Sequence, residues 1–355
     1  MISTLDRYIG RSILTTSLLV MLTLTTLAGI FAFIGELDDV GKGSYSVGKA
    51  AQYVFLTLPG RVYLLFAPAV LLGSLLGLGT LAANSELTVM RAAGVSNARI
   101  IRAVLITGFG LMLLMGLWGE YIVPKSEQIA EELRLTALEK RLSVRGDSGL
   151  WVKSQDRYVN IATVMPDFTL LDLSIYEFEQ GQMSQAIAVA KATPANDGAW
   201  LLEDLVVTQL NDNAAAVTRI DEQIWPSLIS ADVLQGLSIS PESLSIRHLH
   251  DQVAYLKDNS LDSARVELAY WIKLTSPLAT IVMLMLSLPF VFTTQRSGGA
   301  GQKIFIGILL GIGYVLLNKL LTHLGLANGF SPAFSAFLPL IVFLCIAIFG
   351  IQKIP

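Results

Sequence analysis

The sequence predicts an α-helical membrane protein with six transmembrane helices and an extracytoplasmic antiparallel β domain inserted between the third and fourth helix. Hydrophobic residues occupy 53% of the 355 positions and charged residues only 15%, whereas a typical soluble domain has about 25% charged residues. Long apolar runs form one block in residues 1–122 and a second in residues 270–355, while residues 123–269 are more polar and rich in β-type segments. A bilayer is therefore the expected solvent of both end blocks.

The membrane spans follow from the length of the apolar runs, because a helix needs roughly 20 mainly apolar residues to cross a bilayer. Five runs meet this length, and a sixth is interrupted by Asn318 and Lys319. The predicted spans are residues 12–34, 63–81, 100–121, 270–292, 304–324 and 332–351. The first run is too long for the apolar core of a cleavable signal peptide, so we expect it to be retained.

Lysine and arginine predict the orientation, because these charges in short loops resist translocation. The short loops on one side hold Arg7, Arg11, Arg91, Arg99, Arg102, Arg296, Lys303 and Lys353. Those on the other side hold only Lys42, Lys49 and Arg61. Both termini are therefore expected in the cytoplasm, and residues 123–269 outside it.

Several classes of function are disfavoured by composition and motifs. The net charge of −3 gives no overall basic field, so no nucleic-acid partner is expected. The single cysteine, Cys345, excludes a disulfide scaffold within one chain, and the three histidines form no catalytic trio or metal motif. No G-x-x-x-x-G-K-[ST] phosphate loop occurs, so energy for any transport has to come from a partner or an ion gradient.

The stretch between the two apolar blocks predicts an antiparallel β domain. Candidate strands at residues 151–159, 173–178, 186–192, 200–210 and 215–224 alternate with turn-forming residues. Helices are expected on either side, at residues 125–142 and 244–269. The sheet can either pack on itself or hold an apolar ligand, and the residues leave both alternatives open.

Residues 84–95, between the second and third spans, predict a short amphipathic helix. Asn84 or Ser85 is expected to cap its start, Glu86 lies in its first turn, and Gly94 suits its end. Leu87 and Met90 supply apolar surface. Such a helix can dock into a groove on a soluble partner or lie against lipid headgroups, and the residues favour neither.

Two other classes of membrane protein compete with a partner-driven transporter. A secondary transporter driven by an ion gradient is expected to carry acids near mid-membrane, but the interiors of the predicted spans hold no Asp or Glu. A membrane scaffold or sensor is also compatible with the β domain and the short helix. Lys319, inside the fifth span, is expected to face an aqueous cavity, a phosphate or an acidic side chain, or else to extend toward the headgroups. Extension toward the headgroups is also expected of Lys273.

A series of short motifs resembles the membrane subunits of the lipopolysaccharide export ABC transporter, the LptF/LptG family, over nearly the whole chain. The motifs are Leu5-Asp-Arg-Tyr-Ile-Gly10, Gly43-Ser-Tyr45, Leu71-Leu-Gly-Ser-Leu-Leu-Gly-Leu-Gly79, Ser85-Glu-Leu-Thr-Val-Met90 with Ala93-Gly94, Gly119-Glu120, Gly149-Leu-Trp151, Leu244-Ser-Ile246 and Tyr255-Leu-Lys257. Their order and spacing carry the resemblance more than any one of them does.

The resemblance implies a non-catalytic permease subunit of the bacterial inner membrane that extracts lipopolysaccharide and passes it to a periplasmic β-jellyroll bridge. It implies an LptF-like membrane subunit, an LptB-like ATPase dimer, an LptC-like bridge protein and lipopolysaccharide as partners. ATP and Mg would be bound by the ATPase, with no cofactor or metal in this chain. The inserted domain would be β-jellyroll-like, and residues 84–95 would be the coupling helix.

The resemblance also implies roles for individual residues. ATPase coupling would involve Ser85, Glu86, Leu87, Met90, Arg91 and Gly94. Lipopolysaccharide contacts would come from Lys42, Lys49, Arg61, Arg134 and Lys319, and a gate against the fifth span from Leu27, Ile30 and Phe33. The chain departs from the family's pattern at the outer end of the first span, where it has Ala32, Asp38 and Asp39 in place of lysines.

Overall fold

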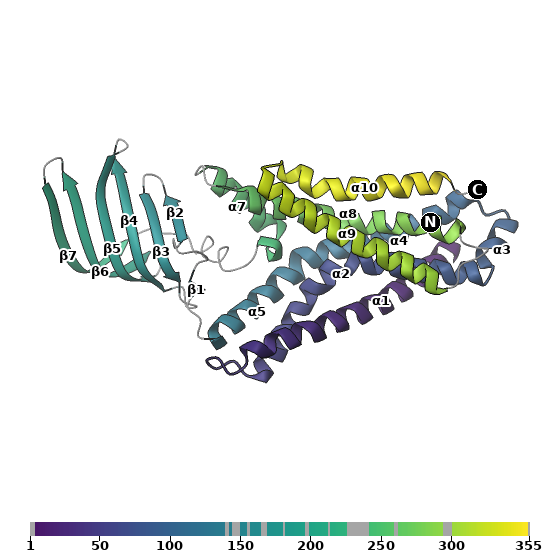
Figure 1. The fold of residues 1–355 in the computed structure, drawn as a ribbon, viewed down its shortest axis with the longest axis horizontal. Helices are drawn as coiled ribbons and strands as arrows, with labels where there is room; N and C mark the ends of the chain where they lie inside the picture. The colour runs from purple at the N-terminus through teal and green to yellow at the C-terminus, as the bar shows by residue number, and fades with distance from the viewer. Residues whose placement is uncertain are drawn as a thin grey trace.

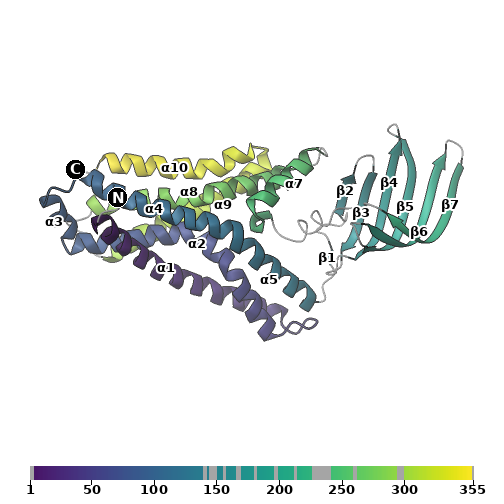
Figure 2. The same cartoon turned by 180° about the vertical axis from the view of Figure 1, so that it is seen from behind.

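The computed structural model describes residues 4–138, 142–143, 150–154, 157–164, 169–179, 182–195, 199–211, 214–225, 241–258, 262–293 and 300–353. An elongated bundle of helices carries an antiparallel sheet beyond one of its ends (Figures 1 and 2). We call this the sheet end of the bundle. The opposite, terminal end holds both chain termini and the short helix α3.

The helices are α1 (Thr4–Glu36), α2 (Val47–Ala83), α3 (Glu86–Ala92), α4 (Asn97–Leu117), α5 (Val123–Leu138), α7 (Ile246–Asp258), α8 (Ala264–Thr293), α9 (Ala300–Asn328) and α10 (Pro332–Gln352). In the described part of the chain, six apolar helical segments of membrane length confirm the predicted spans, and one of them consists of α4, the π-helical turn η2 (Trp118–Ile122) and α5. Short 3-10 turns are η1 (Leu37–Asp39) and η4 (Pro241–Ser243). Several helices extend past the predicted apolar runs, since helical hydrogen bonding continues into amphipathic flanks.

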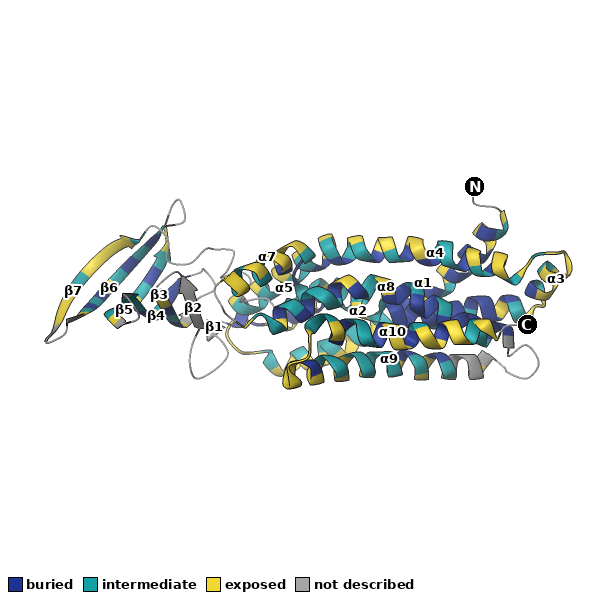
Figure 3. Ribbon diagram, turned by 90° about the horizontal axis from the view of Figure 1, so that it is seen from above, coloured by how far each residue is buried: buried dark blue, intermediate teal, exposed yellow. Residues whose placement is uncertain are grey.

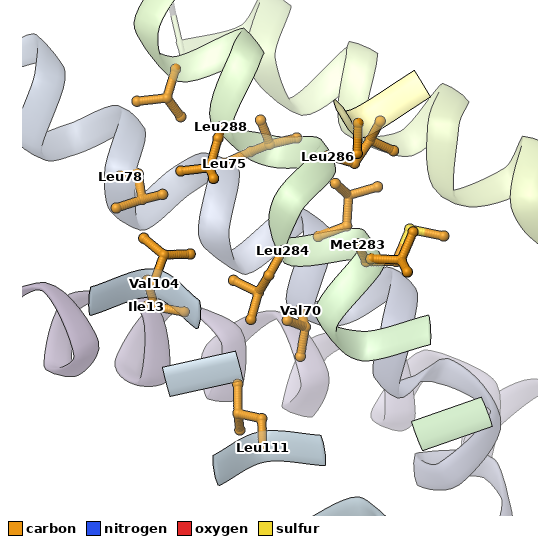
Figure 4. Packing of buried hydrophobic residues seen from close by; sticks show 14 of the residues in the cluster. Ile13, Val70, Leu75, Leu78, Val104, Leu111, Met283, Leu284, Leu286 and Leu288 are labelled. Atoms are coloured by element: carbon orange, nitrogen blue, oxygen red, sulfur yellow. The ribbon is translucent and has the colours of Figure 1, made fainter. Parts of the chain in front are cut away.

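The main hydrophobic core lies between α1, α2, α4, α8 and α10. Figure 4 shows side chains of several of these helices in it, among them Ile13, Leu78, Val104 and Leu284. Figure 3 shows the buried positions concentrated toward the terminal end, whereas α9 carries mainly intermediate and exposed positions. At the sheet end, α1 and α5 lie along one edge of the bundle and α9 and α10 along the other (Figure 1).

A close seam joins α1 to α2 near the terminal end. Gly73 and Gly77 form a G-x-x-x-G pair on α2, and a Cβ at Gly77 would meet Thr16 Oγ1 at 2.6 Å and the Ser12 carbonyl at 2.8 Å. Thr16 Oγ1 donates to the Gly73 carbonyl at 2.6 Å, and Ser12 Oγ to the Gly77 carbonyl at 3.2 Å. Small residues let helix backbones approach in a membrane, and hydroxyl hydrogen bonds then add to the packing.

The strands are β1 (Leu142–Ser143), β2 (Leu150–Ser154), β3 (Arg157–Val164), β4 (Leu170–Glu179), β5 (Gln182–Pro194), β6 (Trp200–Asn211) and β7 (Ala214–Trp225). They form one antiparallel sheet in the order β1-β3-β4-β5-β6-β7, with β2 also paired to β3. The antiparallel β domain between the third and fourth spans is confirmed. The first predicted strand is in fact two, because β2 and β3 pair as a hairpin with Ser154 opposite Arg157.

One face of the sheet is lined by buried apolar side chains in cross-strand register. Val159, Ile175 and Ile187 form one row across β3, β4 and β5, and Leu173, Val189 and Leu205 form another. The alternation of buried and exposed positions is interrupted at Asp172 and Asp204, both of which have φ near +54°. These residues mark a line across the sheet where the strands change which side chains face inward.

Candidate functional site

The helix α3 is anchored to the bundle by its apolar residues. Leu87 is fully buried in the main core, and Met90 and Val95 pack against the same core. Gly94, with φ of +90°, allows the helix to end in a Schellman turn, in which the N–H groups of Gly94 and Val95 donate to the carbonyls of Arg91 and Met90. The short helix is thus fixed at its C-terminal end by backbone geometry as well as by packing.

The predicted side-chain cap of α3 is wrong, although Ser85 does stand directly before the helix. Ser85 lies in the left-handed region with φ of 59°, and its side chain makes no capping hydrogen bond. Asn84 ends α2 instead, and its Nδ2 group donates to Glu86 Oε1 over 3.4 Å. Ser85 therefore makes the sharp change of direction between α2 and α3, which side-chain preference alone did not reveal.

The direction of Leu87 corrects the expectation that it contacts a partner as an apolar knob. The side chain points into its own bundle, where it is inaccessible. The outward face of α3 instead presents Val89, which is 65% exposed, together with Thr88 and Arg91. Met90 is divided between the two environments, since it is partly buried against the core.

Glu86 is held by the first turns of α1. Tyr8 Oη donates to Glu86 Oε2 at 2.6 Å, and both side chains are accessible at the terminal end. Nearby, the buried Asp6 of α1 forms an ion pair with Arg99 of α4, with 3.9 Å between Oδ1 and Nε. The N-terminal turns of α1 thus contact both the short helix and α4, and the role of Tyr8 was missed in the sequence.

At the sheet end, Arg134 lies in a cluster of internal interactions. Its Nε is 3.2 Å from Glu36 Oε2, its Nη2 is 2.9 Å from Asp39 Oδ2, and its guanidinium lies 5.1 Å from the centroid of the Tyr53 ring. Tyr45 Oη also donates to Glu36 Oε2, at 3.0 Å. Burial and this hydrogen bond raise the pKa of Tyr45 above its ordinary value.

We name Glu36, Asp39, Tyr45 and Arg134 the Arg134 cluster. It ties the end of α1 to α5, and backbone contacts reinforce it, since Ser44 N donates to the Ala137 carbonyl at 2.8 Å. The charge of Arg134 is thus shared with two carboxylates of the chain, and its predicted contact with substrate stays a prediction. Asp39, which departs from the family's pattern, is one of these carboxylates.

The other expected cations of this end differ in their surroundings. Lys42 pairs with Asp39 at 2.6 Å, and Lys49 Nζ donates to Ser44 Oγ at 2.9 Å. Arg61 is partly buried, and its positive charge favours the ionised form of the Glu127 carboxyl. Its Nε has no hydrogen-bond partner among the described residues. Lys42 and Arg134 therefore share Asp39, and Lys49 is joined to the same region through Ser44.

Lys319 lies on α9, the least covered of the candidate spans. Its side chain is exposed and makes no hydrogen bond or ion pair with the described part of the chain. It follows an exposed apolar face that consists of Phe305, Leu309, Ile312 and Leu316. Exposed leucines continue beyond it at Leu320 and Leu324, so Lys319 is a cation within an apolar face, a combination that matches the chemistry of an amphiphilic anion.

The expected gate residues divide into two groups. Leu27 and Ile30 are exposed, at 49% and 53%. Phe33 instead packs into a small cluster with Tyr45 and Leu138. The main contacts of α1 are with α2 and α4, and those of α9 are with α2, α10 and α8.

A buried polar site that the sequence did not reveal joins Glu120 of η2 to Lys273 of α8 through residues 244–246. Lys273 is only 4% exposed, so it does not extend to the headgroups as expected. Its partners lie far away in the chain, and no local pattern signals the contact.

Together, the six spans, the surface helix between the second and third of them, and the inserted sheet define a multi-pass membrane protein of the transporter-permease type. The chain belongs to the LptF/LptG family of lipopolysaccharide export system permeases, whose family model matches residues 7–353.

Individual relatives agree with this assignment and with the sequence resemblance. The chain is 34% identical to the lipopolysaccharide export system permease protein LptG of Escherichia coli K12 over 353 residues, which is 98% of each chain. It is 33% identical to LptG of Haemophilus influenzae Rd over 348 residues, or 97% of each chain. The similarity is thus to LptG proteins over nearly the full length of both chains.

Proposed function

We propose that the chain is an inner-membrane permease subunit for lipopolysaccharide export, driven by ATP hydrolysis on a separate subunit. In this proposal the terminal end faces the cytoplasm, and the sheet end and the sheet face the periplasm. The chain pairs with an LptF-like subunit, binds an LptB-like ATPase dimer through α3, and passes lipopolysaccharide to an LptC-like bridge protein. ATP and Mg belong to the ATPase.

The observation that carries the coupling part of the proposal is the position of Glu86 on an anchored surface helix. Val89 and Arg91 face outward beside it, as a docking face requires, while Leu87 anchors the helix inward. Because α3 is joined through Ser85 to α2 and through a Schellman turn to α4, a force on α3 reaches both spans as a rigid displacement. Such displacement is one of the common forms of a conformational transition.

The substrate part of the proposal rests on α9 and on the sheet. Lys319 would contact a phosphate of the glycolipid headgroup, and the exposed apolar face of α9 its acyl chains. The apolar rows of the sheet would continue the path as one element of a β-jellyroll bridge. Lys42, Lys49, Arg61 and Arg134 remain candidate headgroup contacts, although Lys42 and Arg134 also form ion pairs within the chain.

Replacement of Glu86 by alanine in the assembled transporter tests the coupling. We expect ATP-driven release of lipopolysaccharide from proteoliposomes to fall about tenfold, the effect of removing one hydrogen bond to a charged group. The Tyr8→Phe variant is the matched control, since it removes the hydroxyl and leaves the carboxylate in place. Normal release with the Glu86→Ala variant would contradict the proposal.

A further inference from the structure

After β7 the described part of the chain resumes at Pro241, and Leu244, Ser245 and Ile246, which we call the re-entry segment, lead into α7. Glu120 Oε2 accepts a hydrogen bond from the Ile246 N–H at 2.8 Å, and Lys273 Nζ donates to the Leu244 carbonyl. Between them, Ser245 caps α7 by accepting from the His248 N–H at 3.2 Å. Two charged side chains from different membrane helices therefore form hydrogen bonds with the backbone at the two ends of the re-entry segment.

The hydrogen bonds at the re-entry segment lie in a buried, closely packed environment. Lys273, Leu244 and Ser245 are at most 8% exposed. Tyr63 of α2 covers the site, with its hydroxyl donating to the Lys273 carbonyl at 3.2 Å and its ring centroid 5.9 Å from Lys273 Nζ. A buried ammonium group is costly unless its hydrogen bonds are satisfied, so the Leu244 carbonyl has a defined role in this site.

Glu120 lies in a π-helical turn that packs against α2. The turn η2 interrupts the long rod between α4 and α5, and the Trp118 Nε1–H donates to the Pro59 carbonyl of α2 at 3.2 Å. Gly119 lies directly against the Tyr63 ring, where any Cβ would clash. Single π-helical turns within α-helices are frequently found at functional sites.

The two charged residues lie on different helical segments, whose helices α4 and α8 meet in the main hydrophobic core. The helix α7 packs on α8 through Leu249, Val266 and Ala269, and Lys257 pairs with Glu267 at 2.8 Å. The contact of Lys273 with Leu244 therefore lies within the α7–α8 unit. The contact of Glu120 with Ile246 instead joins that unit to the rod that begins immediately after α3.

We infer that Glu120 and Lys273 are positioning residues that transmit displacement of the α4 rod to the re-entry segment, and through it to the periplasmic sheet. The inference rests on the proposed function and adds a second route for the force that enters at α3. The first route moves the spans themselves. The second moves the element that receives the cargo, so extraction from the membrane and transfer to the sheet are timed together.

The test separates these two steps in the complete transporter complex. A photoreactive amino acid at Ile220, partly buried against the apolar face of the sheet, reports transfer, and one at Leu316 on α9 reports extraction. In the Glu120→Ala complex we expect lipopolysaccharide adducts at Ile220 to fall about tenfold, as for loss of a hydrogen bond to a charged group, with ATP hydrolysis and adducts at Leu316 retained. Glu120→Gln should restore much of the transfer, because its amide oxygen can still accept from Ile246.

Two further variants guard against a purely structural explanation. Lys273→Met keeps the length of the side chain but removes the donor, and should match Glu120→Ala. Lys257→Ala, at the exposed end of α7, removes only the surface ion pair and should leave transfer unchanged. An equal fall in ATP hydrolysis and in both adducts would overturn the inference, as would unchanged adducts at Ile220.

Hydrogen exchange of the unsubstituted complex gives an independent measurement. Exchange in residues 244–250 should change between the nucleotide-free and the vanadate-trapped states, and identical exchange would also overturn the inference. Absence of ATP-dependent adducts in the unsubstituted complex would refute the proposed function. Normal adducts there, together with an unaffected Glu120→Ala complex, would refute the positioning role alone.

Discussion

Replacement of Leu87 by alanine distinguishes an inward anchor from an outward docking residue on α3. The side chain is completely buried in the main core, so its truncation leaves a cavity. Leucine-to-alanine replacements at such positions cost about 2 to 5 kcal/mol. The matched variant on the outward face is Val89→Ala, where a side chain that is 65% exposed should contribute no more than about 0.5 kcal/mol.

Two assays are needed. The first follows unfolding of the purified permease in mixed micelles by its helical circular dichroism signal. The second measures how much ATPase is retained on the immobilised permease. Leu87→Ala should unfold at a clearly lower denaturing-detergent fraction, whereas Val89→Ala should unfold like the unsubstituted chain. Val89→Asp should weaken ATPase retention without loss of stability, because it places a charge on the docking face. If Leu87→Ala is fully stable but no longer retains the ATPase, the side chain faces the partner and the reasoning fails.

Three further predictions concern the seam and the Arg134 cluster. Gly77→Val should destabilise the permease by about 1 to 3 kcal/mol through overpacking against Thr16 and Ser12; in the same unfolding assay Gly110→Val, which has open space, should have a smaller effect. Arg134→Gln should lower the free energy of unfolding by about 1 to 3 kcal/mol, since Glu36 and Asp39 lose their shared cation. The same variant should be cleaved faster by protease near residue 40, whereas Lys42→Gln should not be. Because the folded-state pKa of Tyr45 is raised, the folded chain holds that proton more tightly than the unfolded chain. The associated stability is present below about pH 10 and is lost as the pH rises beyond it. Tyr45→Phe should therefore lessen alkaline destabilisation measured by unfolding at increasing pH, and an unchanged pH profile would contradict this role.

The elements that the sequence predicted are those specified by local patterns. Apolar runs define the spans, because each helix has to satisfy its own backbone within the membrane. Turn-forming residues located the later strands β4 to β7 to within a few residues. Strands β2 and β3 were predicted as one strand, since only two residues separate them within a β-type segment.

The features that escaped prediction depend on distant parts of the chain. Arg134 and Asp39 are 95 residues apart, and Glu120 and Ile246 are 126 apart, so neither contact has a local signal. Ser85 has the composition of a helix cap, but its left-handed backbone serves a change of direction. Leu87 illustrates a general limit, because an amphipathic pattern identifies an apolar face without indicating which neighbour covers it.

The seam and the Arg134 cluster together restrict how α1 can change shape. The helix is pinned near one extremity by interlocked glycines and hydroxyls, and at the other by a guanidinium shared between two acids. A helix that is held at both ends cannot rotate away from the bundle as a rigid body. Displacement of α1 therefore requires the helix to bend outward in its middle, around Leu22 to Ile30, unless one of the two end contacts breaks first.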